Sequence, residues 1–503
     1  MRVLLYALYI FRRAIQSIFL VGILLWLCCA ISAAKTPVSR KLLTDTADVN
    51  ALFVQNIDRA ITLVDRGLSC YFSGEGSRLK MSRYYNVSSG TRSDEVASVW
   101  MFGSSFQAVT AILEGLTVLK RNGYAKRYDR YFDHYRTILK DLFNSAAYYL
   151  GTFRLTSYTQ TRKWTVYGVN RSDQKGAAAV QGRENVYDDQ MWLIRDFLDA
   201  YQVTGDSAYL DKAEYLVAYV LDGWDCTIDA NGNEAGGITW GPGYVTKHAC
   251  SNAPLIASLV RLSVLYGRSG EEMTYRYIDK ADRKSRRTKT MTKHDYYLMF
   301  ARKLYDWQKK KLLDPTVGVY ADMLGGARDS KVHFQKVRGT LYRKNTPLGD
   351  QTGSFISYNS GTMLSAAAHL YAATKEARYL EDARALAAAS FRYFAKEGKE
   401  VPGYYSYNSS GFNGWFNGVL FRGYVDALSL DKAAGAYVES FQKNLDFGYQ
   451  HYLMDGLLPR NLLRGWGKSM VIGGMITFTY VAEYAILAQL ALKGVVARAE
   501  KQG

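Results

Sequence analysis

The residues Tyr201-Gln202-Val203-Thr204-Gly205-Asp206 run directly into Ser207-Ala208-Tyr209-Leu210-Asp211-Lys212-Ala213, and this stretch decides the predicted fold. One helix ends at the glycine, a tight turn follows, and Asp206 can cap the helix that begins next. The same pattern returns in residues 371–383, and a third copy, interrupted by an insertion, begins at Tyr266 and resumes at Tyr297. Each copy predicts two helices that pack back on one another across a short turn.

Apolar residues recur at helical spacing through most of the remaining chain, whereas no alternating run is long enough for a major sheet. With 7 prolines and 43 glycines, the breaks between helices are mostly glycines. We predict an all-α fold in which six helical hairpins close into an (α/α)6 barrel, and an open helical solenoid is the alternative. The twelve predicted helices are 42–68, 96–122, 128–150, 188–204, 207–222, 251–267, 294–312, 359–374, 377–397, 412–428, 430–450 and 471–495.

The N-terminus has the order of a secretory signal. Arg2, Arg12 and Arg13 precede an apolar run from Ile18 to Ile31, and small residues follow at positions 32–34. We predict a signal peptide over residues 1–34, or a membrane anchor if this segment is not cleaved, and a single domain over residues 35–503. The protein is therefore expected to be exported: secreted, periplasmic or on the cell surface.

Composition narrows the possible partners. The formal net charge is +18, but the basic residues are scattered and no nucleic-acid-binding motif accompanies them, so no nucleic-acid partner is expected. Aromatic residues make up 14% of the chain, including 40 tyrosines, and aromatic faces with a polar edge suit sugar rings as well as ordinary cores. One basic run lies near residues 271–293, and we predict a solvated loop there, with contact to an anionic glycan or membrane surface as the alternative.

Two adjacent carboxylates, Asp188 and Asp189, stand at the start of an amphipathic helix in the stretch of residues 184–192. Burial beside apolar bulk and mutual repulsion should raise the pKa of at least one of them. One ionised and one protonated carboxyl is the pair that glycosidic-bond cleavage needs. The alternative is a capping role, because Asn185 and Asp188 resemble a capping box and acids are favoured in a first helical turn.

Five elements follow one another along the chain after the signal. The first is the aspartate pair with its neighbours, and the second is a loop rich in glycine and tryptophan. A helix start that bears an asparagine, a Tyr-Asn-x-Gly element and a late aromatic–glycine helix complete the set. These elements are Tyr187-Asp188-Asp189 with Trp192, residues 223–225 with 236–240, Ser251-Asn252-Ala253, Tyr358-Asn359-Ser360-Gly361, and residues 416–422. In this order they resemble glycoside hydrolase family 76, the α-1,6-mannanases, over essentially the whole chain after the signal.

The resemblance implies an (α/α)6 barrel and retaining hydrolysis of α-1,6-mannosidic bonds, with Asp188 as nucleophile and Asp189 as general acid/base. It also implies mannan polysaccharide or mannooligosaccharide as the partner and no metal or organic cofactor. We expect endo-action by a monomer. Transfer of the glycan instead of hydrolysis stays open, and so does a non-catalytic glycan-binding or wall-anchoring protein.

Six residues are candidates for substrate binding, and three of them have a competing structural role. Trp240 is a sugar-stacking platform or a loop anchor, Asn252 a ligand contact or a cap, and Asp322 a cleft residue or a surface acid. Trp415 and Phe416 are expected in the core. The full set of substrate-binding candidates is Tyr187, Trp240, Asn252, Asp322, Tyr358 and Asn359.

The cysteines and histidines add two further predictions. Cys226 and Cys250 bracket the glycine-rich loop, and a disulfide there would stabilise an exported protein by roughly 2–4 kcal/mol. Cys70 is the alternative partner. The six histidines show no metal-ligand spacing, so no metal site is expected.

Overall fold

The computed structural model describes residues 46–326 and 330–502. Asn50–Gly503 is one compact unit, and Met1–Val49 is a second unit of which only residues 46–49 are described. The predicted signal or anchor over residues 1–34 therefore lies outside the described residues.

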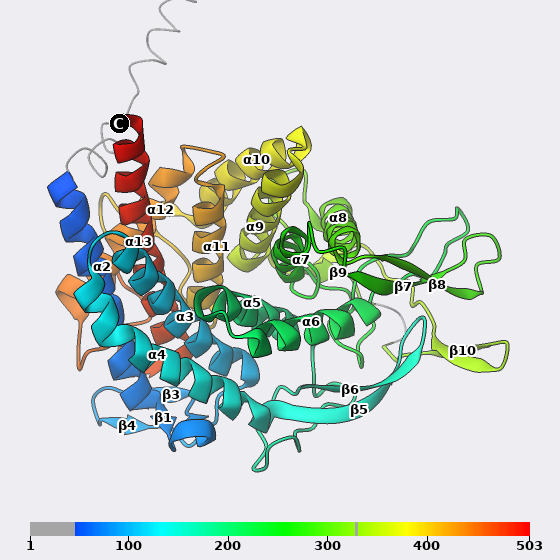
Figure 1. The fold of residues 1–503 in the computed structure, drawn as a ribbon. Helices are drawn as coiled ribbons and strands as arrows, with labels where there is room; N and C mark the ends of the chain where they lie inside the picture. Colours follow the sequence, from blue (N-terminus) through cyan, green and yellow to red (C-terminus); the bar gives the residue numbers. More distant parts are fainter. Residues whose placement is uncertain (1–45, 327–329, 503) are drawn as a thin grey trace, which may run out of the picture. The chain divides into compact units, whose positions relative to one another are not determined.

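Twelve α-helices make up most of the described chain (Figure 1). Each overlaps one of the twelve predicted segments, so the prediction of a mainly helical protein is confirmed. The helices are α2 (Thr46–Tyr71), α3 (Val99–Arg121), α4 (Ala125–Ser145), α5 (Tyr187–Thr204), α6 (Ser207–Asp222), α7 (Pro254–Leu265), α8 (Lys293–Leu312), α9 (Ser357–Thr374), α10 (Ala377–Phe394), α11 (Asn413–Ala427), α12 (Ala434–Tyr452) and α13 (Gly474–Gln502).

The turn that predicted the fold has the expected chemistry. α5 ends at Gly205, whose φ of +73° is a left-handed value that glycine adopts without strain. Asp206 then accepts a hydrogen bond from the backbone N–H of Ala208 at 3.0 Å and caps α6. In the related turn between α9 and α10 the left-handed position is Lys375, with φ +60°, and Glu376 gives no side-chain cap. The same hairpin therefore forms with two different sets of turn residues.

Alternate helices pack against one another along the chain. α3 lies against α5, α5 against α7, α7 against α9, α9 against α11, α11 against α13, and α13 against α3. We call these six the inner helices, because α4, α6, α8, α10 and α12 each follow one of them and pack on it. Among the described residues only α3 is long and apolar enough to cross a membrane, but 83% of its apolar window is buried in the protein. α3 is therefore a core helix.

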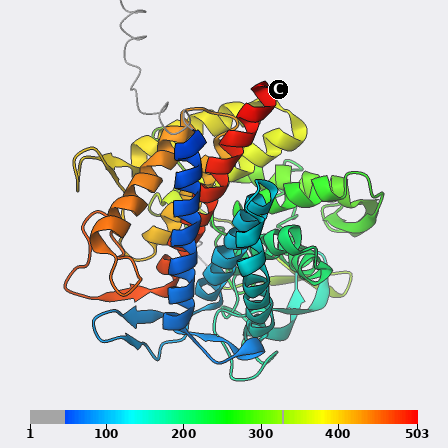
Figure 2. The same cartoon turned by 60° about the vertical axis from the view of Figure 1, so that its left-hand side comes forward.

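The first described helix is joined to the last two. The Asn56 amide donates to Gln442 of α12 at 2.8 Å. The Arg59 guanidinium pairs with Asp446 of α12 and lies 4.5 Å from the ring centroid of Tyr449. Figure 2 shows α2 running beside α12 and α13. These contacts tie the beginning of the larger unit to its end.

The three longest β-hairpins among the described residues interrupt the helices, and helical spacing in the sequence did not predict them. The first pairs β5 (Leu150–Thr156) with β6 (Thr161–Tyr167), the second pairs β7 (Glu272–Ile278) with β8 (Arg286–Thr292), and the third pairs β10 (Phe334–Val337) with β11 (Thr340–Arg343). The short elements are η2 (Gly76–Arg78), η3 (Ala146–Tyr149), β1 (Phe72–Ser73), β2 (Lys80–Met81), β3 (Tyr84–Asn86), β4 (Thr91–Arg92), β9 (Met323–Leu324), β12 (Gln351–Thr352), β13 (Lys396–Glu397), β14 (Tyr405–Ser406) and β15 (Val471–Gly473).

The basic insertion is one of these hairpins, which corrects the prediction of a solvated loop over residues 271–293. Its basic side chains are on an outer surface, but Tyr275 and Ile278 are buried. The hydroxyl of Tyr275 accepts a hydrogen bond from Lys303 of α8 at 3.0 Å. Because β8 runs directly into the Thr292 cap of α8, the insertion is attached to the helical body at both its side and its end.

The three hairpins meet at the turn of the first one (Figure 1). Arg286 of β8 donates to the carbonyl of Tyr158 at 3.0 Å, and the backbone N–H of Arg343 in β11 donates to Ser157 at 2.9 Å. The Arg343 guanidinium also donates to the carbonyls of Pro242 and Tyr244. The hairpins thus hold the glycine-rich loop in place, and this loop forms one wall of the cavity described next.

Candidate active site

A cavity of about 580 Å³ lies where five of the inner helices begin. Its lining comes from the starts of α3, α5, α9 and α11 and from the segment just before α7, together with the glycine-rich loop. Helix N-termini carry partial positive charge, so this end of the helices favours negatively charged groups. The lining residues used below are Trp100, Asp188, Asp189, Trp192, Trp240, Tyr244, His248, Cys250, Asp322, Tyr358, Phe412 and Phe416.

The aspartate pair lies in the first turn of α5 and opens into this cavity. The capping alternative does not hold for Asn185, because its amide oxygen accepts from the Tyr219 hydroxyl at 2.6 Å and its NH2 group donates to the carbonyl of Val180. Val186 occupies the N-cap position and gives α5 no side-chain cap. No capping box therefore forms between Asn185 and Asp188, and both carboxyl-bearing residues line the cavity.

Burial acts on both carboxyls. It raises the pKa of Asp188 to about 6, while the Cys250 thiol, the Trp240 indole and the first-turn amides of residues 188 and 189 act in the opposite direction. Burial, and then the charge of Asp188, raises the pKa of Asp189 well above its usual value. Neither side chain forms an ion pair within the described residues. Of the two carboxyls, Asp189 is therefore the one that holds its proton more tightly as the pH rises.

Two buried polar atoms face the cavity without a hydrogen-bond partner among the described residues. One is Oδ1 of Asp188 and the other is the indole Nε1 of Trp240. Buried donors and acceptors are normally paired, and an unpaired one costs roughly 1–3 kcal/mol. An acceptor and a donor left unpaired on residues that line one cavity can both be satisfied by a hydroxyl-bearing ligand.

Aromatic side chains form much of the cavity wall. Trp240 stacks on His248, with ring centroids 5.0 Å apart, and packs against Tyr244 at 4.8 Å. A second group consists of Trp100 and Phe412, 4.9 Å apart, with Phe416 beside them. Flat apolar faces of this kind stack on the C–H faces of sugar rings.

Five of the predicted site residues lie together at the cavity: Asp188, Asp189, Trp240, Asp322 and Tyr358. The Tyr358 hydroxyl accepts a hydrogen bond from the Trp192 indole at 2.8 Å, which positions both rings in the wall. Burial raises the pKa of Asp322, so a third carboxyl of altered acidity faces the same space.

Three predicted substrate-binding residues do not line the cavity, because the protein itself occupies their side chains. The Tyr187 ring is buried against Tyr219 at 5.1 Å. The Asn252 amide accepts from the N–H of Ile238 at 2.8 Å and donates to the carbonyl of His248 at 2.7 Å, which fastens the glycine-rich loop. Asn359 is buried and donates to the carbonyl of Ala321 at 3.2 Å.

The predicted disulfide is absent, since Cys70, Cys226 and Cys250 are all free thiols. Cys250 lies against Asp188, whereas Cys226 lies near Glu234 of the loop and Lys303 of α8. A buried ion pair between Asp225 and Lys247, at 2.8 Å, closes the loop instead.

Sequence reasoning missed several wall residues. Trp100, Tyr244, His248 and Phe412 were not singled out, and Phe416, expected in the core, lines the cavity, while Trp415 is buried as expected. Burial lowers the pKa of His248 to about 4, so its ring is neutral near pH 7.

Among the described residues no three His, Cys, Asp or Glu side chains are grouped so that they could hold a metal ion.

Solved structures share this fold. A family 76 glycoside hydrolase (mannosidase) from Bacteroides thetaiotaomicron is 22% identical with a TM-score of 0.64, over 87% of this chain and 98% of that one. An α-1,6-mannanase from Salegentibacter sp. is 19% identical with a TM-score of 0.53, over 87% and 99%. An inactive variant of that mannanase, with two consecutive aspartates replaced by asparagine, is in complex with α-1,6-mannotriose; it is 18% identical with a TM-score of 0.53, over 86% and 99%.

The sequence comparisons give the family. No curated protein matches the chain. The model of glycosyl hydrolase family 76 matches residues 140–285 and 281–451, which span most of the helical unit and include the aspartate pair and the glycine-rich loop. The chain therefore belongs to glycosyl hydrolase family 76.

Proposed function

We propose that this protein is a retaining endo-α-1,6-mannanase in which Asp188 is the nucleophile and Asp189 the general acid/base. The observation that carries the proposal is the pair itself: two neighbouring carboxyls with unequal, raised pKa values in an aromatic cavity. Support also comes from the related mannanase that was inactivated by replacing two consecutive aspartates and holds an α-1,6-mannooligosaccharide.

The reaction would proceed in two displacements. Asp188 attacks the anomeric carbon while the glycosidic C–O bond breaks, and the proton of Asp189 passes to the leaving oxygen. A water molecule then gives a proton to the Asp189 carboxylate and attacks the same carbon, and the bond to Asp188 breaks. The first-turn amides and the positive end of α5 help to keep Asp188 ionised before attack.

Substrate binding follows from the cavity wall. In this proposal Trp240 stacks on a mannose ring and its indole N–H donates to a sugar hydroxyl. Tyr358 and Asp322 bound the same space. Tyr187, Asn252 and Asn359 do not contact the substrate in this proposal. They hold α5, the glycine-rich loop and α9 in position.

For the architecture we infer an (α/α)6 barrel. The inner helices contact one another in the order α3, α5, α7, α9, α11, α13 and again α3, which supports a closed ring over the open solenoid. Export and a monomeric state stay predictions from the sequence.

Incubation with linear α-1,6-mannan, followed by sizing of the products, tests the activity directly. An endo-enzyme should release a range of oligosaccharides early, and proton NMR of the first products should show retained configuration. Inverted product would refute the two-displacement scheme. Products longer than the substrate would indicate transfer, and binding without any product would favour a glycan-binding protein.

A further inference from the structure

A second, much larger hollow lies beside the candidate active site. It has a volume of about 1210 Å³ and is lined by the segment after α10, the loop before α11 and the loop between α12 and β15. We call it the groove, and the residues used below are Phe355, Tyr393, Lys396, Lys399, Glu400, Arg460, Arg464 and Trp466. None of these residues lines the candidate active site.

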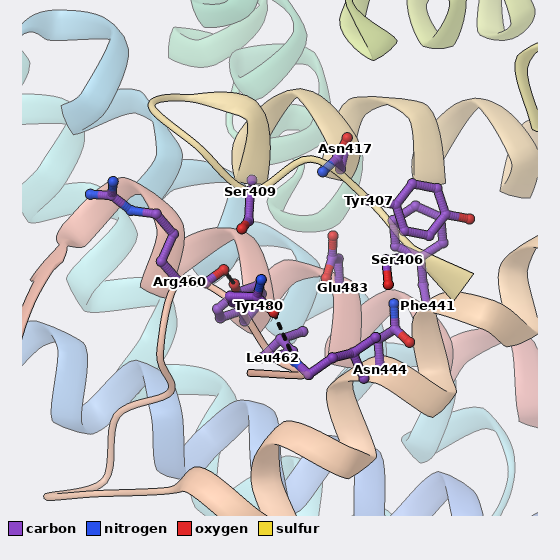
Figure 3. Close-up of a pocket in the computed structure, with 13 residues that line it drawn as sticks. Ser406, Tyr407, Ser409, Asn417, Phe441, Asn444, Arg460, Leu462, Tyr480 and Glu483 are labelled. Atoms are coloured by element: carbon purple, nitrogen blue, oxygen red, sulfur yellow. Dashed lines mark hydrogen bonds between the residues drawn. The ribbon is translucent and has the colours of Figure 1, made fainter. Parts of the chain in front are cut away.

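The groove leads into a small polar pocket of about 60 Å³, with which it shares Ser406, Tyr407, Ser409, Arg460 and Asn461. Figure 3 shows Ser406, Asn417, Asn444 and Glu483 gathered around this pocket, with the Arg460 side chain pointing away from them. The pocket is thus the floor of the groove.

The floor holds polar groups that the described residues leave unsatisfied. Glu483 is 4% exposed, and its carboxyl forms no hydrogen bond or ion pair with any described residue. Ser406 Oγ and Asn444 Oδ1 are buried without a partner as well. Burial raises the pKa of Glu483 to about 8, so at neutral pH it is mostly a neutral acid that can donate and accept hydrogen bonds. Three such groups around one small space suit the hydroxyls of a polar ligand.

The rim has two further properties. Tyr393 is 36% exposed and packs edge-on against Phe355, with centroids 5.5 Å apart, and the Lys396 ammonium lies 5.8 Å from its ring centroid, so an exposed ring and a cation stand together. Lys396, Lys399, Arg460 and Arg464 are basic, and the only ion pair that these four form among the described residues is Arg464 with Glu400. The rim therefore has an excess of positive charge.

The groove and the candidate active site are lined by the same two chain segments. Phe355 lines the groove, and the next residue, Ile356, lines the site. Likewise residues 406–410 line the groove, and Phe412 lines the site. A linear chain that leaves the site past these two segments would reach the groove.

We propose that the groove is a second glycan-binding site, which takes an α-mannan chain carrying negatively charged substituents such as phosphate. Sugar rings stack on Tyr393, hydroxyls enter the polar floor, and the substituents pair with Lys396, Lys399 and Arg460. This inference rests on the proposed function, since it assigns to the groove a distant part of the chain that the active site cleaves.

The test measures binding in a variant that cannot turn over its ligand, Asp188→Asn with Asp189→Asn, produced in a bacterial host. The ligands are α-1,6-mannotetraose, a long phosphorylated α-1,6-mannan, and the same polymer after removal of its phosphate. The groove variant adds Lys399→Ala and Arg460→Ala. Its control adds Lys126→Ala and Lys140→Ala on α4, which removes the same charge from exposed positions that line none of these cavities.

We expect the groove variant to lose about tenfold in affinity for the phosphorylated polymer, and the control to lose none. Mannotetraose affinity should be equal in all three proteins. The preference of the parent for the phosphorylated polymer should weaken as salt rises, because exposed charges are screened. Tyr393→Ala should weaken binding of both polymers.

Glu483→Leu tests the floor. It should weaken binding of both polymers while mannotetraose binding stays intact. If this variant does not fold, the affinity of the groove variant for the phosphorylated polymer still tests the inference. Equal binding of the phosphorylated and dephosphorylated polymers, or a groove variant that behaves like the control, would overturn the inference. Failure of the proposed function would instead be seen as a parent that does not bind mannotetraose.

Discussion

The two ends of helix α5 carry the same residue type in opposite surroundings. Asp188 and Asp189 at its start face an aromatic cavity and have no cationic partner among the described residues. Asp199 near its end pairs with Arg261 of α7 at 2.5 Å, in a cavity of about 620 Å³ that four arginines share with Glu114 and Asp426. Paired carboxylates hold helices together, whereas unpaired ones keep altered pKa values and stay available for chemistry. In the proposed mechanism the first end, which opens into the aromatic cavity, is the reactive one.

The largest effect should come from removing the carboxyls at the reactive end. Either Asp188→Asn or Asp189→Asn should lower kcat on linear mannan by about 10⁴-fold or more, because each acts in the reaction as part of one unit. Asp199→Asn, the matched change at the other end, should keep kcat within about threefold when expressed per folded molecule. An equal loss of kcat in Asp199→Asn would show that the two ends of α5 do not differ in their role in catalysis.

The pH dependence of kcat/KM should report the unequal pair. Activity should fall as the pH drops below about 6, because Asp188 then takes up a proton and is no longer a nucleophile. It should fall again at higher pH, where Asp189 loses the proton that the leaving group needs. A profile flat between pH 4 and 9 would contradict this assignment.

Stability should respond with opposite sign at the two ends. Burial raises the pKa of both carboxyls, so the folded state holds their protons more tightly than the unfolded state, and the stability they contribute is lost as pH rises through the folded pKa. Asp188→Asn should therefore stabilise the protein by about 1–3 kcal/mol at pH 8 and by almost nothing at pH 3.

Arg261→Ala is the counterpart at the other end. Loss of the contacts to Asp199 and Gln202 should cost about 1–3 kcal/mol at neutral pH, with little change in kcat. Denaturant titration of Asp188→Asn and Arg261→Ala at each pH measures whether the free energy of unfolding rises or falls. If Asp188→Asn unfolds more easily than the parent protein at pH 8, burial does not destabilise the ionised Asp188 carboxyl in the folded state.

The smallest effect should come from the thiol beside the nucleophile. Cys250 lowers the pKa of Asp188, and a hydroxyl is the stronger hydrogen-bond donor. Cys250→Ser should therefore move the acid limb of the pH profile down by a few tenths of a unit, and Cys250→Ala should move it up. Cys226→Ser, on the other side of the loop, should leave the limb in place, and any equal shift there would rule out a local cause.

The sequence by itself determined the helices and singled out the aspartate pair as the candidate for chemistry. Helical periodicity and the turn at Gly205-Asp206 are local properties, and each α-helix forms from its own hydrogen bonds, so all twelve helices were predictable. The pair was recognisable because Asp188 and Asp189 are adjacent and followed by an apolar helix face. The resemblance placed them in a family before any contact was known.

Only the tertiary structure decided what surrounds the pair. Trp100, Trp240 and Phe412 come from segments more than a hundred residues apart, and no local pattern states that they share a wall. The path of the glycine-rich loop across the helix ends also depends on tertiary structure. It brings the Asn252 amide onto the loop backbone at Ile238 and keeps Cys226 apart from Cys250. The β-hairpins escaped prediction for the same reason, since strand pairing and the burial of Tyr275 are satisfied by distant partners.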